Sequence, residues 1–317
     1  MQGKGLMAIS GVVFVMSLWF LPSAGDAGEP KTREVTCSSK KTIGEELRKL
    51  DPGDTLLVSG TCNENVVFGD GRRNLVIDGQ GSATISGPNP NQPTVNIRGR
   101  NITIKGFTIT GGQEGVHVHR GGFATIDDNL IQNVGTSGIG IHNQANAIIV
   151  NNTIQGNPED GINVIGGSNA FIGIRSVSNL VAGPNTIQNN GRHGIFVTRG
   201  SNARVVGNAI SGNDENGVIV TRASQADVSS NTINNSGENG IFVNQNSGVN
   251  LGNDVGTGII DAPNSTTVAN GLNGIRCRLN SYADGRLGTL NGAAGAKNFN
   301  FTAPGANNGG CHDSLDL

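Results

Sequence analysis

A carboxylate and a histidine stand at matching places in two similar stretches of the chain. Asp160 precedes a Gly-Ile pair, and His193 precedes another 33 residues later. A carboxylic acid beside an imidazole can exchange protons near neutral pH, because burial and neighbouring charges shift both pKa values toward neutrality. We therefore predict that Asp160 and His193 form an acid–base pair if the protein is an enzyme, with Glu159 in a supporting role.

Three arginines recur near the same positions. Arg192 directly precedes His193, and Arg199 and Arg222 each follow a short apolar stretch, 23 residues apart. A guanidinium group holds a carboxylate or a sulfate through two parallel hydrogen bonds. We expect these arginines to bind an acidic glycan. For Arg192 the alternative is a salt-bridged ladder of alternating charges, in which each pair contributes little stability. For Arg199 and Arg222 the alternative is a plain solvated face.

His117 and His119 occupy alternate positions of one short β-type stretch, and His142 follows the next such stretch. We predict that His117 and His119 contact the same substrate. Metal binding by the three histidines is an alternative, but this spacing often arises by chance, and a plain solvated face is a third interpretation. We expect no metal and no cofactor.

These residues belong to a repeat that is led by glycine. Seven stretches of the form Gly-(Ile/Val)-x-(Val/Ile/Cys) begin at Gly115, Gly138, Gly161, Gly194, Gly217, Gly240 and Gly274. The intervals between them are 23, 23, 33, 23, 23 and 34 residues. A fixed period with two longer intervals indicates a repeat architecture with insertions, which fall around residues 174–184 and 255–270.

Two further columns share this period. One has the form Ala-x-(Ile/Val), and the other is mostly Asn-x-Ile, at Asn129, Asn152, Asn185, Asn208 and Asn231. Three strand signals per period predict three strands per coil, with alternate residues on opposite faces. Ile195 and Val197 then point inward and Phe196 outward. Stacked coils would lie about 4.8 Å apart, and the asparagines would form a ladder of side-chain hydrogen bonds.

An apolar stripe follows from the same alternation. Phe196, Ile219 and Phe242 take the outward position on three consecutive coils. A solvent-facing stripe of this kind needs a cover or a partner. The C-terminal segment or an inserted loop, a second copy of the chain, and a ligand are the three alternatives.

The N-terminus has the features of a targeting segment. Lys4 precedes an apolar run over residues 6–21, and small residues follow it, which predicts a signal peptide over residues 1–27. An uncleaved membrane anchor is the alternative, because the run is almost long enough to span a bilayer. We expect a secreted or periplasmic protein with no stable membrane span after processing.

The four cysteines are an even number, as in a chain exported to an oxidising compartment. Of the three possible pairings we favour Cys37–Cys62 and Cys277–Cys311, which would fix each end of the molecule. A zinc site needs closer ligand spacing than these cysteines provide. The formal net charge of −2 gives no electrostatic reason to expect a nucleic-acid partner.

The repeat resembles the right-handed parallel β-helix of the pectin-lyase-like superfamily, in which Asn-x-Ile and Gly-Ile-x-Val alternate. The resemblance covers about residues 35–280. It implies a polysaccharide partner held along an outer strand face, although the superfamily includes lyases, hydrolases, epimerases, phage tailspikes and non-catalytic surface proteins. Residues 158–162 and 191–195 also resemble part of the polygalacturonase pattern, but Thr136 and Ser137 stand where that family has a further Asp.

The expected fold is all-β: a signal peptide (1–27), an N-terminal strand and capping helix (28–53), a right-handed parallel β-helix of roughly ten three-stranded coils (54–281), and an irregular C-terminal cap (282–317). We expect a protein that binds a polysaccharide, with an acidic glycan favoured. Whether it also processes that polysaccharide, as a hydrolase, lyase or epimerase, stays open. The alternatives are a non-catalytic structural or adhesive solenoid, and a polygalacturonase-like hydrolase with an incomplete motif.

Overall fold

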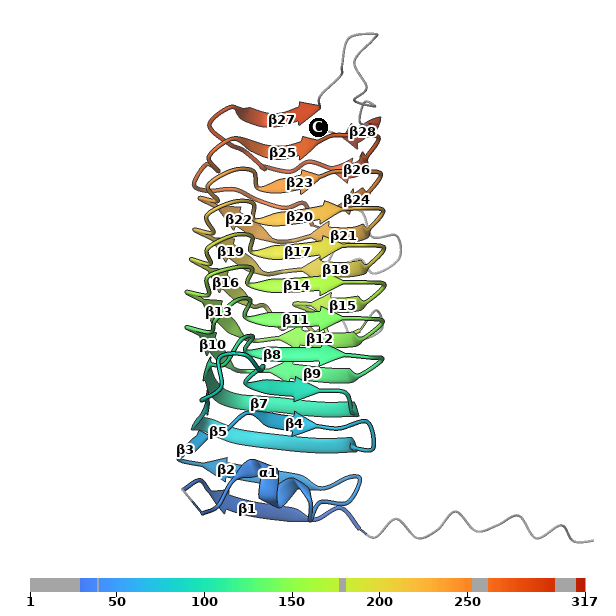
Figure 1. Cartoon of the computed structure of the whole chain (residues 1–317). Helices are drawn as coiled ribbons and strands as arrows, with labels where there is room; N and C mark the ends of the chain where they lie inside the picture. The colour runs from blue at the N-terminus through green and yellow to red at the C-terminus, as the bar shows by residue number, and fades with distance from the viewer. Residues whose placement is uncertain (1–28, 39, 177–180, 253–261, 300–311, 317) are drawn as a thin grey trace, which may run out of the picture.

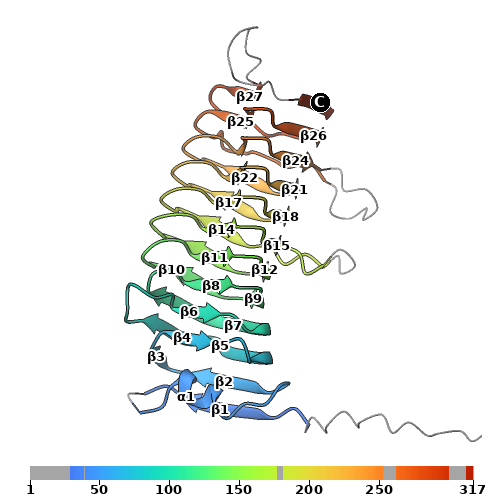
Figure 2. The same cartoon turned by 45° about the vertical axis from the view of Figure 1, so that its right-hand side comes forward.

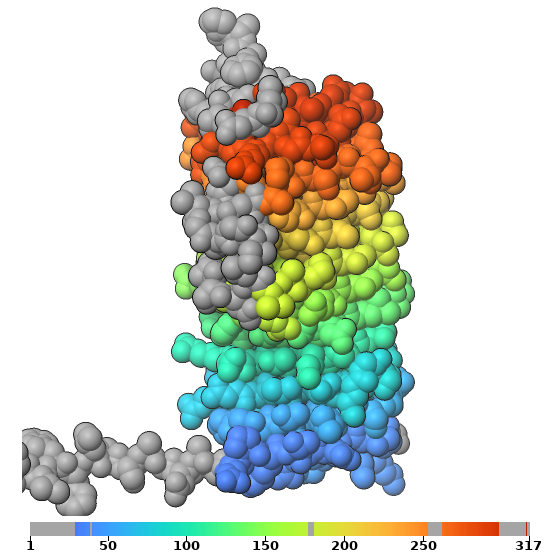
Figure 3. Space-filling view, turned by 180° about the vertical axis from the view of Figure 1, so that it is seen from behind, coloured from blue at the N-terminus to red at the C-terminus, as the bar shows by residue number. Residues whose placement is uncertain are grey.

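The computed structural model describes residues 29–38, 40–176, 181–252, 262–299 and 312–316. These residues form a column of about eleven stacked coils with almost no helix (Figure 1). From behind, the coils appear as successive tiers that run from the N-terminal to the C-terminal end (Figure 3). The expected all-β, right-handed parallel β-helix is confirmed, with about one coil more than the repeat count predicted.

The glycine-led stretches form a ten-stranded parallel sheet. Each strand pairs with the strand one period away, as Ile139 does with Ile162 and Ile162 with Ile195. The 33-residue interval is therefore one coil with an insertion, as predicted. The strands are β4 (Val66–Phe68), β6 (Val95–Ile97), β8 (Val116–His119), β11 (Ile139–His142), β14 (Ile162–Ile165), β17 (Ile195–Thr198), β20 (Val218–Thr221), β23 (Ile241–Val243), β25 (Asn273–Cys277) and β27 (Gly295–Phe299).

The Ala-x-(Ile/Val) stretches form a second stack, which we call the alanine stack. It contains β1 (Thr32–Thr36), β2 (Thr55–Ser59), β9 (Phe123–Asp127), β12 (Asn146–Val150), β15 (Asn169–Ile172), β18 (Asn202–Val206), β21 (Gln225–Ser229), β24 (Gly248–Leu251), β26 (Tyr282–Arg286) and β28 (His312–Asp316). A third stack contains β3 (Thr61–Asn63), β10 (Leu130–Gln132), β13 (Thr153–Gln155), β16 (Thr186–Gln188), β19 (Ala209–Ser211) and β22 (Thr232–Asn234). Two long strands, β5 (Arg73–Gly87) and β7 (Arg100–Gly111), pair with members of both stacks.

The core lies inside the column, where inward side chains of the three stacks meet. Ile195 and Val197 are fully buried, while Phe196 between them is partly exposed, as the alternation predicts. Fully burying an aliphatic side chain of this size contributes about 1.5–3 kcal/mol. Like residues stack on like residues from coil to coil, so one continuous apolar core runs along the axis.

The asparagine column forms the predicted ladder at the corner between the alanine stack and the third stack. From Asn129 to Asn264, each side-chain amide donates to the side-chain oxygen of the next asparagine at 2.9–3.0 Å. Two similar ladders were not predicted. One joins Asn157, Asn190 and Asn213, and the other joins backbone N–H groups to Ser168, Ser201, Ser224, Ser247 and Ser281.

The N-terminal end is closed by one short helix, α1 (Ile43–Leu47). Thr42 caps it by accepting a hydrogen bond from the Glu45 N–H at 3.1 Å, as the capping-box pattern predicts. The helix is shorter than expected, because Leu50 lies beyond it, although Leu50 is still buried. The predicted Cys37–Cys62 disulfide is confirmed, with Cα atoms 5.0 Å apart.

Several sequence predictions concern residues outside the described part of the chain. These are the signal peptide at residues 1–27, and Cys311, which we predicted to pair with Cys277. Among the residues that the structure describes, no helix is both long and apolar enough to cross a membrane. The segment after residue 281, predicted as an irregular cap, includes β26, β27 and β28, which extend the parallel stacks.

The first insertion leaves the column after β15 (Figure 2). Its described residues fold back onto the alanine stack, where Ile174 packs with Val206 and Phe171. Arg175 reaches Asp127 of β9, with Nη2 2.8 Å from Oδ2. The second insertion falls mostly on residues 253–261, which lie outside the described residues.

Candidate functional site

Asp160 and His193 lie on neighbouring coils, directly before β14 and β17. The Asp160 carboxylate accepts a hydrogen bond from the backbone N–H of His193 at 3.3 Å. The imidazole of His193 faces the other neighbouring coil, with Nδ1 3.3 Å from the Asn216 N–H donor and Nε2 3.2 Å from Glu215 Oε2. The carboxylate of Asp160 therefore meets the backbone of His193, and Glu215 contacts the imidazole.

The column that contains Asp160 and His193 is a fourth hydrogen-bonded ladder. On the following coils its members are Asn216, Asn239 and Asn273, which are linked through their side chains at 2.8 and 3.1 Å. Only 1% of Asp160 and 4% of His193 is exposed. Each of the two residues therefore holds a place that later coils give to asparagine.

Burial changes the proton affinity of both groups. It raises the pKa of Asp160 to about 6, against the opposing effect of Arg192. It lowers the pKa of His193 to about 3, with Arg192 acting in the same direction. Asp160 can therefore take up or release a proton near neutral pH, while His193 stays neutral. Their role in catalysis stays a prediction.

Glu159 and Arg192 are neighbours through the backbone, since the Arg192 N–H donates to the Glu159 carbonyl at 3.1 Å. The guanidinium of Arg192 lies 3.8 Å from Asp160 Oδ2 and 5.7 Å from the centre of the Phe196 ring. Arg192 thus contacts the predicted pair. Arg199 and Arg222 stand farther along, on the exposed turns that lead into β18 and β21.

The apolar stripe is present as predicted. Phe196 pairs with Ile219, and Ile219 with Phe242, in the ten-stranded sheet. Ile219 is only 8% exposed, and the guanidinium of Arg276 lies 5.7 Å from the Phe242 ring centre. Self-association through this stripe stays a prediction.

The three histidines do come together, with a fourth residue that sequence reasoning did not join to them. His117 stacks on His119, with ring centres 4.5 Å apart, and meets the edge of His142 at 4.6 Å. Glu114 Oε2 lies 3.0 Å from His117 Nδ1, and Glu114 Oε1 lies 3.9 Å from His142 Nε2. His119 turns its Nε2 toward Asn96 at 2.8 Å. Glu114 stands three residues before His117 in the sequence, but this spacing alone does not show that its side chain turns toward the histidines.

Burial also lowers the pKa values of two of these histidines. The pKa of His119 falls to about 4, first through burial and then through the charge of His117. The pKa of His142 is lowered by burial, which outweighs the opposing effects of Glu114 and Asn163. Both rings are therefore neutral near pH 7, the form in which an imidazole nitrogen can bind a metal ion or accept a hydrogen bond.

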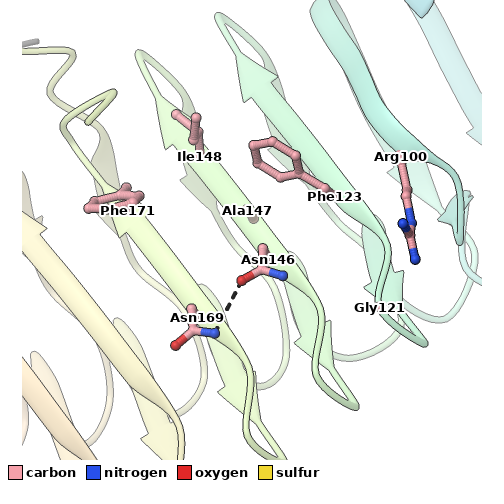
Figure 4. Close-up of a pocket in the computed structure, with 8 residues that line it drawn as sticks. All are labelled: Arg100, Gly121, Phe123, Asn146, Ala147, Ile148, Asn169 and Phe171. Atoms are coloured by element: carbon pink, nitrogen blue, oxygen red, sulfur yellow. Dashed lines mark hydrogen bonds between the residues drawn. The ribbon is translucent and has the colours of Figure 1, made fainter. Parts of the chain in front are cut away.

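The alanine stack carries a hollow that sequence reasoning missed. Its cavity volume is about 530 Å³. Figure 4 shows Phe123, Ile148 and Phe171 on three successive strands, with Arg100 at one end. The exposed amide of Asn169 donates to Asn146 at 3.1 Å in the same hollow. The residues that line it are Arg100, Gly121, Phe123, Asn146, Ala147, Ile148, Asn169 and Phe171.

A second hollow of about 260 Å³ continues the first along the same stack. Asn169 and Phe171 line both, and Arg204 and Asp227 line the farther one. We call the two together the alanine-stack groove. Arg199 and Arg222 lie on the exposed turns that lead into β18 and β21, two strands of the alanine stack. Asn146, Asn169 and Asn202 repeat in register on these strands, but Phe123 and Phe171 do not share one position of the repeat, so the period did not reveal the groove.

Comparisons with known proteins agree with this fold. A family model described as a right-handed beta helix region matches residues 93–255 and 172–281, which together cover more than half of the chain. A cell surface glycoprotein of Methanothermus fervidus is 28% identical over 126 residues, which are 38% of this chain and 21% of that protein. The match thus spans about a fifth of that relative's length.

Two solved structures have the same fold. The A-module of the mannuronan C-5 epimerase AlgE6 from Azotobacter vinelandii matches with a TM-score of 0.53 and 15% identity, over 92% of this chain and 90% of that one. The pectate lyase Pel9A matches with a TM-score of 0.52 and 11% identity, over 92% and 78%. At these identities the similarity concerns the fold alone. The chain belongs to the right-handed β-helix family.

Proposed function

We propose that the protein binds a polysaccharide, and that the alanine-stack groove is the binding surface. The observation that carries this proposal is the hollow that extends across successive coils and is lined by Phe123, Ile148 and Phe171 together with the exposed amides of Asn146 and Asn169. A ring such as that of Phe123 offers apolar area at a small entropic cost to the apolar face of a sugar. The side chains of Asn146 and Asn169 offer hydrogen bonds to hydroxyl groups.

The charges of the groove favour an acidic glycan. Arg100 is exposed at one end, and Arg204 lines the other. Arg199 and Arg222, predicted from the sequence to bind an acidic substrate, are exposed on adjacent turns. Guanidinium groups at these places can bind carboxylates or sulfates of successive sugar units through paired hydrogen bonds. Asp227 makes the far end less favourable for an anion than the near end.

We also place the protein outside the cytoplasm. The disulfide between Cys37 and Cys62 requires an oxidising compartment in most organisms. The relative named a cell surface glycoprotein supports an extracellular or periplasmic site. The predicted signal peptide at residues 1–27 agrees with this proposal.

Binding is tested with immobilised uronate polymers, with neutral glucans and galactans as the comparison, by affinity electrophoresis and a glycan array. The variant Phe123→Ala removes a half-buried ring of the groove. We expect affinity for the acidic polymers to fall about 10-fold or more, which corresponds to about 1.4 kcal/mol for one well-placed anchor. Arg100→Ala should weaken binding of acidic polymers only.

The matched control is Phe196→Ala, which removes a half-buried outward ring from the ten-stranded sheet instead. It should leave binding unchanged. Equal losses in both phenylalanine variants would contradict the groove, and no binding by the wild-type protein would favour the structural or adhesive alternative. Loss in Phe196→Ala alone would move the site to the face that carries Arg192.

Processing of a polysaccharide at the column of Asp160 and His193, which is not part of the groove, is a second candidate, supported by the Asp160 carboxyl group, whose pKa of about 6 suits proton transfer near neutral pH. The same polymers are incubated with the protein and assayed for reducing ends and unsaturated products. If turnover occurs, Asp160→Asn should abolish it while the circular dichroism stays unchanged. Turnover that survives in both Asp160→Asn and His193→Ala would exclude this pair.

A further inference from the structure

We propose that Glu114, His117 and His142 bind a divalent transition-metal ion of the Zn²⁺ class on the ten-stranded sheet. The three residues offer one carboxylate oxygen and two imidazole nitrogens, all within 4.8 Å of one another. Zn²⁺ takes such ligands at about 2.0–2.2 Å. Two ligand atoms of one such ion are at most about 4.4 Å apart, so small rotations of the Glu114 and histidine side chains bring all three onto one ion.

The backbone leaves space for an ion among these ligands. Gly140 holds the outward position of β11 between His117 of β8 and Asn163 of β14. A Cβ atom there would lie 2.5 Å from Glu114 Oε1 and 3.1 Å from His142 Nε2. Any side chain at position 140 would thus displace the carboxylate from the two rings. The glycine is needed for this close approach rather than for a special backbone angle.

A fourth donor, the side-chain oxygen of Asn163, faces the same place. Asn163 Oδ1 is hydrogen-bonded to His142 Nε2, and the amide is held in this orientation because Asn163 Nδ2 donates to Ser137 Oγ at 2.9 Å. When an ion takes the lone pair of His142 Nε2, the ring proton moves to Nδ1 and the Asn163 oxygen becomes available to the ion. The donor set is then two nitrogens and two oxygens.

This donor set selects the class of ion. Imidazole nitrogens suit Zn²⁺, Co²⁺, Ni²⁺ and Cu²⁺, whereas Ca²⁺ and Mg²⁺ prefer six or more oxygens. His117 Nδ1 is the nitrogen that faces the carboxylate, 3.0 Å from Glu114 Oε2. The other ring nitrogen, Nε2, is buried and has no hydrogen-bond partner among the described residues. The side chains of His117 and His142 are 18% and 21% exposed, which lets an ion enter from solvent.

The test uses the full chain, purified without a polyhistidine tag and treated with a chelator. Titration with ZnCl₂ is followed by calorimetry, and titration with CoCl₂ by the visible absorption of the bound ion. We expect one equivalent of each ion to bind, and CaCl₂ not to compete. Each of the variants Glu114→Gln, His117→Gln and His142→Gln should weaken Zn²⁺ binding at least about 10-fold, as even second-shell changes do.

The matched control is His119→Gln, because His119 stacks on His117 but turns its Nε2 toward Asn96. It should keep the wild-type affinity, whereas Gly140→Ala should lose binding although it removes no ligand. No Zn²⁺ binding by the wild type would overturn the proposal. So would equal affinity in a Glu114→Gln/His142→Gln double variant, or a loss in His119→Gln as large as in His142→Gln. Glycan binding at the alanine-stack groove does not enter any of these measurements.

Discussion

Asp160 places a carboxyl group at a buried ladder position that the following coils fill with the uncharged amide of asparagine. Burial raises its pKa to about 6 in the folded protein, against 3.8 ordinarily, because Arg192 and the His193 N–H only partly oppose burial and the charges of Glu159 and Glu215 add to it. Between pH 3.8 and pH 6, the Asp160 carboxyl group therefore keeps its proton in the folded state but has lost it in the unfolded state. Its stabilising effect is complete below pH 3.8 and is lost as the pH rises through 6.

The variant Asp160→Asn should therefore be more stable than the wild type at pH 7, and the difference should shrink toward zero as the pH falls to 4. About two pKa units correspond to about 3 kcal/mol, and Asn suits the ladder because Asn216 and Asn239 already occupy it. Urea unfolding at pH 4, 5, 6 and 7 measures the change. A difference that does not vary with pH would contradict the shifted pKa of Asp160.

The control for this series is His193→Asn, in which the trend should run in the opposite direction. The pKa of His193 is lowered from 6.5 to about 3. Between these two pH values the imidazole is therefore protonated in the unfolded state and neutral in the folded state. The stability that His193 contributes is present above pH 6.5 and is lost as the pH falls toward 3. Removing the ring should make the protein less sensitive to acid between pH 6 and 4.

At the scale of elements, the corners of the coils depend on ladders as much as on the core. Asn208 accepts from the backbone N–H and the side-chain amide of Asn185 at 3.1 and 2.9 Å, and donates to Asn231 at 3.0 Å. Asn208→Ala would leave these buried groups without a partner. Each such group costs about 1–3 kcal/mol.

We expect Asn208→Ala to lower the free energy of unfolding by about 2–4 kcal/mol, as measured by urea unfolding. Asn146→Ala is the comparison, because Asn146 is exposed on the alanine stack. It should cost less than about 1 kcal/mol. Similar losses in the two variants would mean that the buried ladder contributes no more to the free energy of unfolding than an exposed asparagine does.

The ladders also show which elements the sequence could predict. Inward residues must match their neighbours on the next coil, so Ile195 and the asparagines of the first ladder repeat with the period and are visible in one sequence. Outward residues face solvent and have no such constraint. Phe123 and Phe171 stand at different places within β9 and β15. The two rings therefore do not recur at one position of the repeat, and the sequence did not predict the groove that they line. Glu114 joined the histidines only when its side-chain direction was known.

At the scale of the whole molecule, each coil contacts only its neighbours, so the ends decide where unfolding begins. At the N-terminal end, α1 covers the core and the Cys37–Cys62 disulfide joins β3 to the chain that follows β1. A bridge between residues 25 apart contributes about 3 kcal/mol by restricting the unfolded chain.

The double variant Cys37→Ser/Cys62→Ser should therefore loosen this end first. Hydrogen exchange should become faster in β1, β2 and α1, while the exchange of β14 and β17 stays as in the wild type. Faster exchange along the entire column would contradict the view that coils unfold from the ends. Addition of a reductant to the wild type should reproduce the faster exchange in β1, β2 and α1, and it should not change the exchange of these three elements in the double variant.

The parallel register of the stacks also limits how such a molecule can change over evolutionary time. Because Ile139, Ile162 and Ile195 pair one above another across intervals of unequal length, the pairing tolerates extra residues at a corner and not within a strand. Duplication or loss of one whole period changes the height of the column by about 4.8 Å and leaves every other coil as it was. A descendant of this chain can therefore lengthen its groove in equal steps, while its chemistry is altered independently by substitutions at single outward positions.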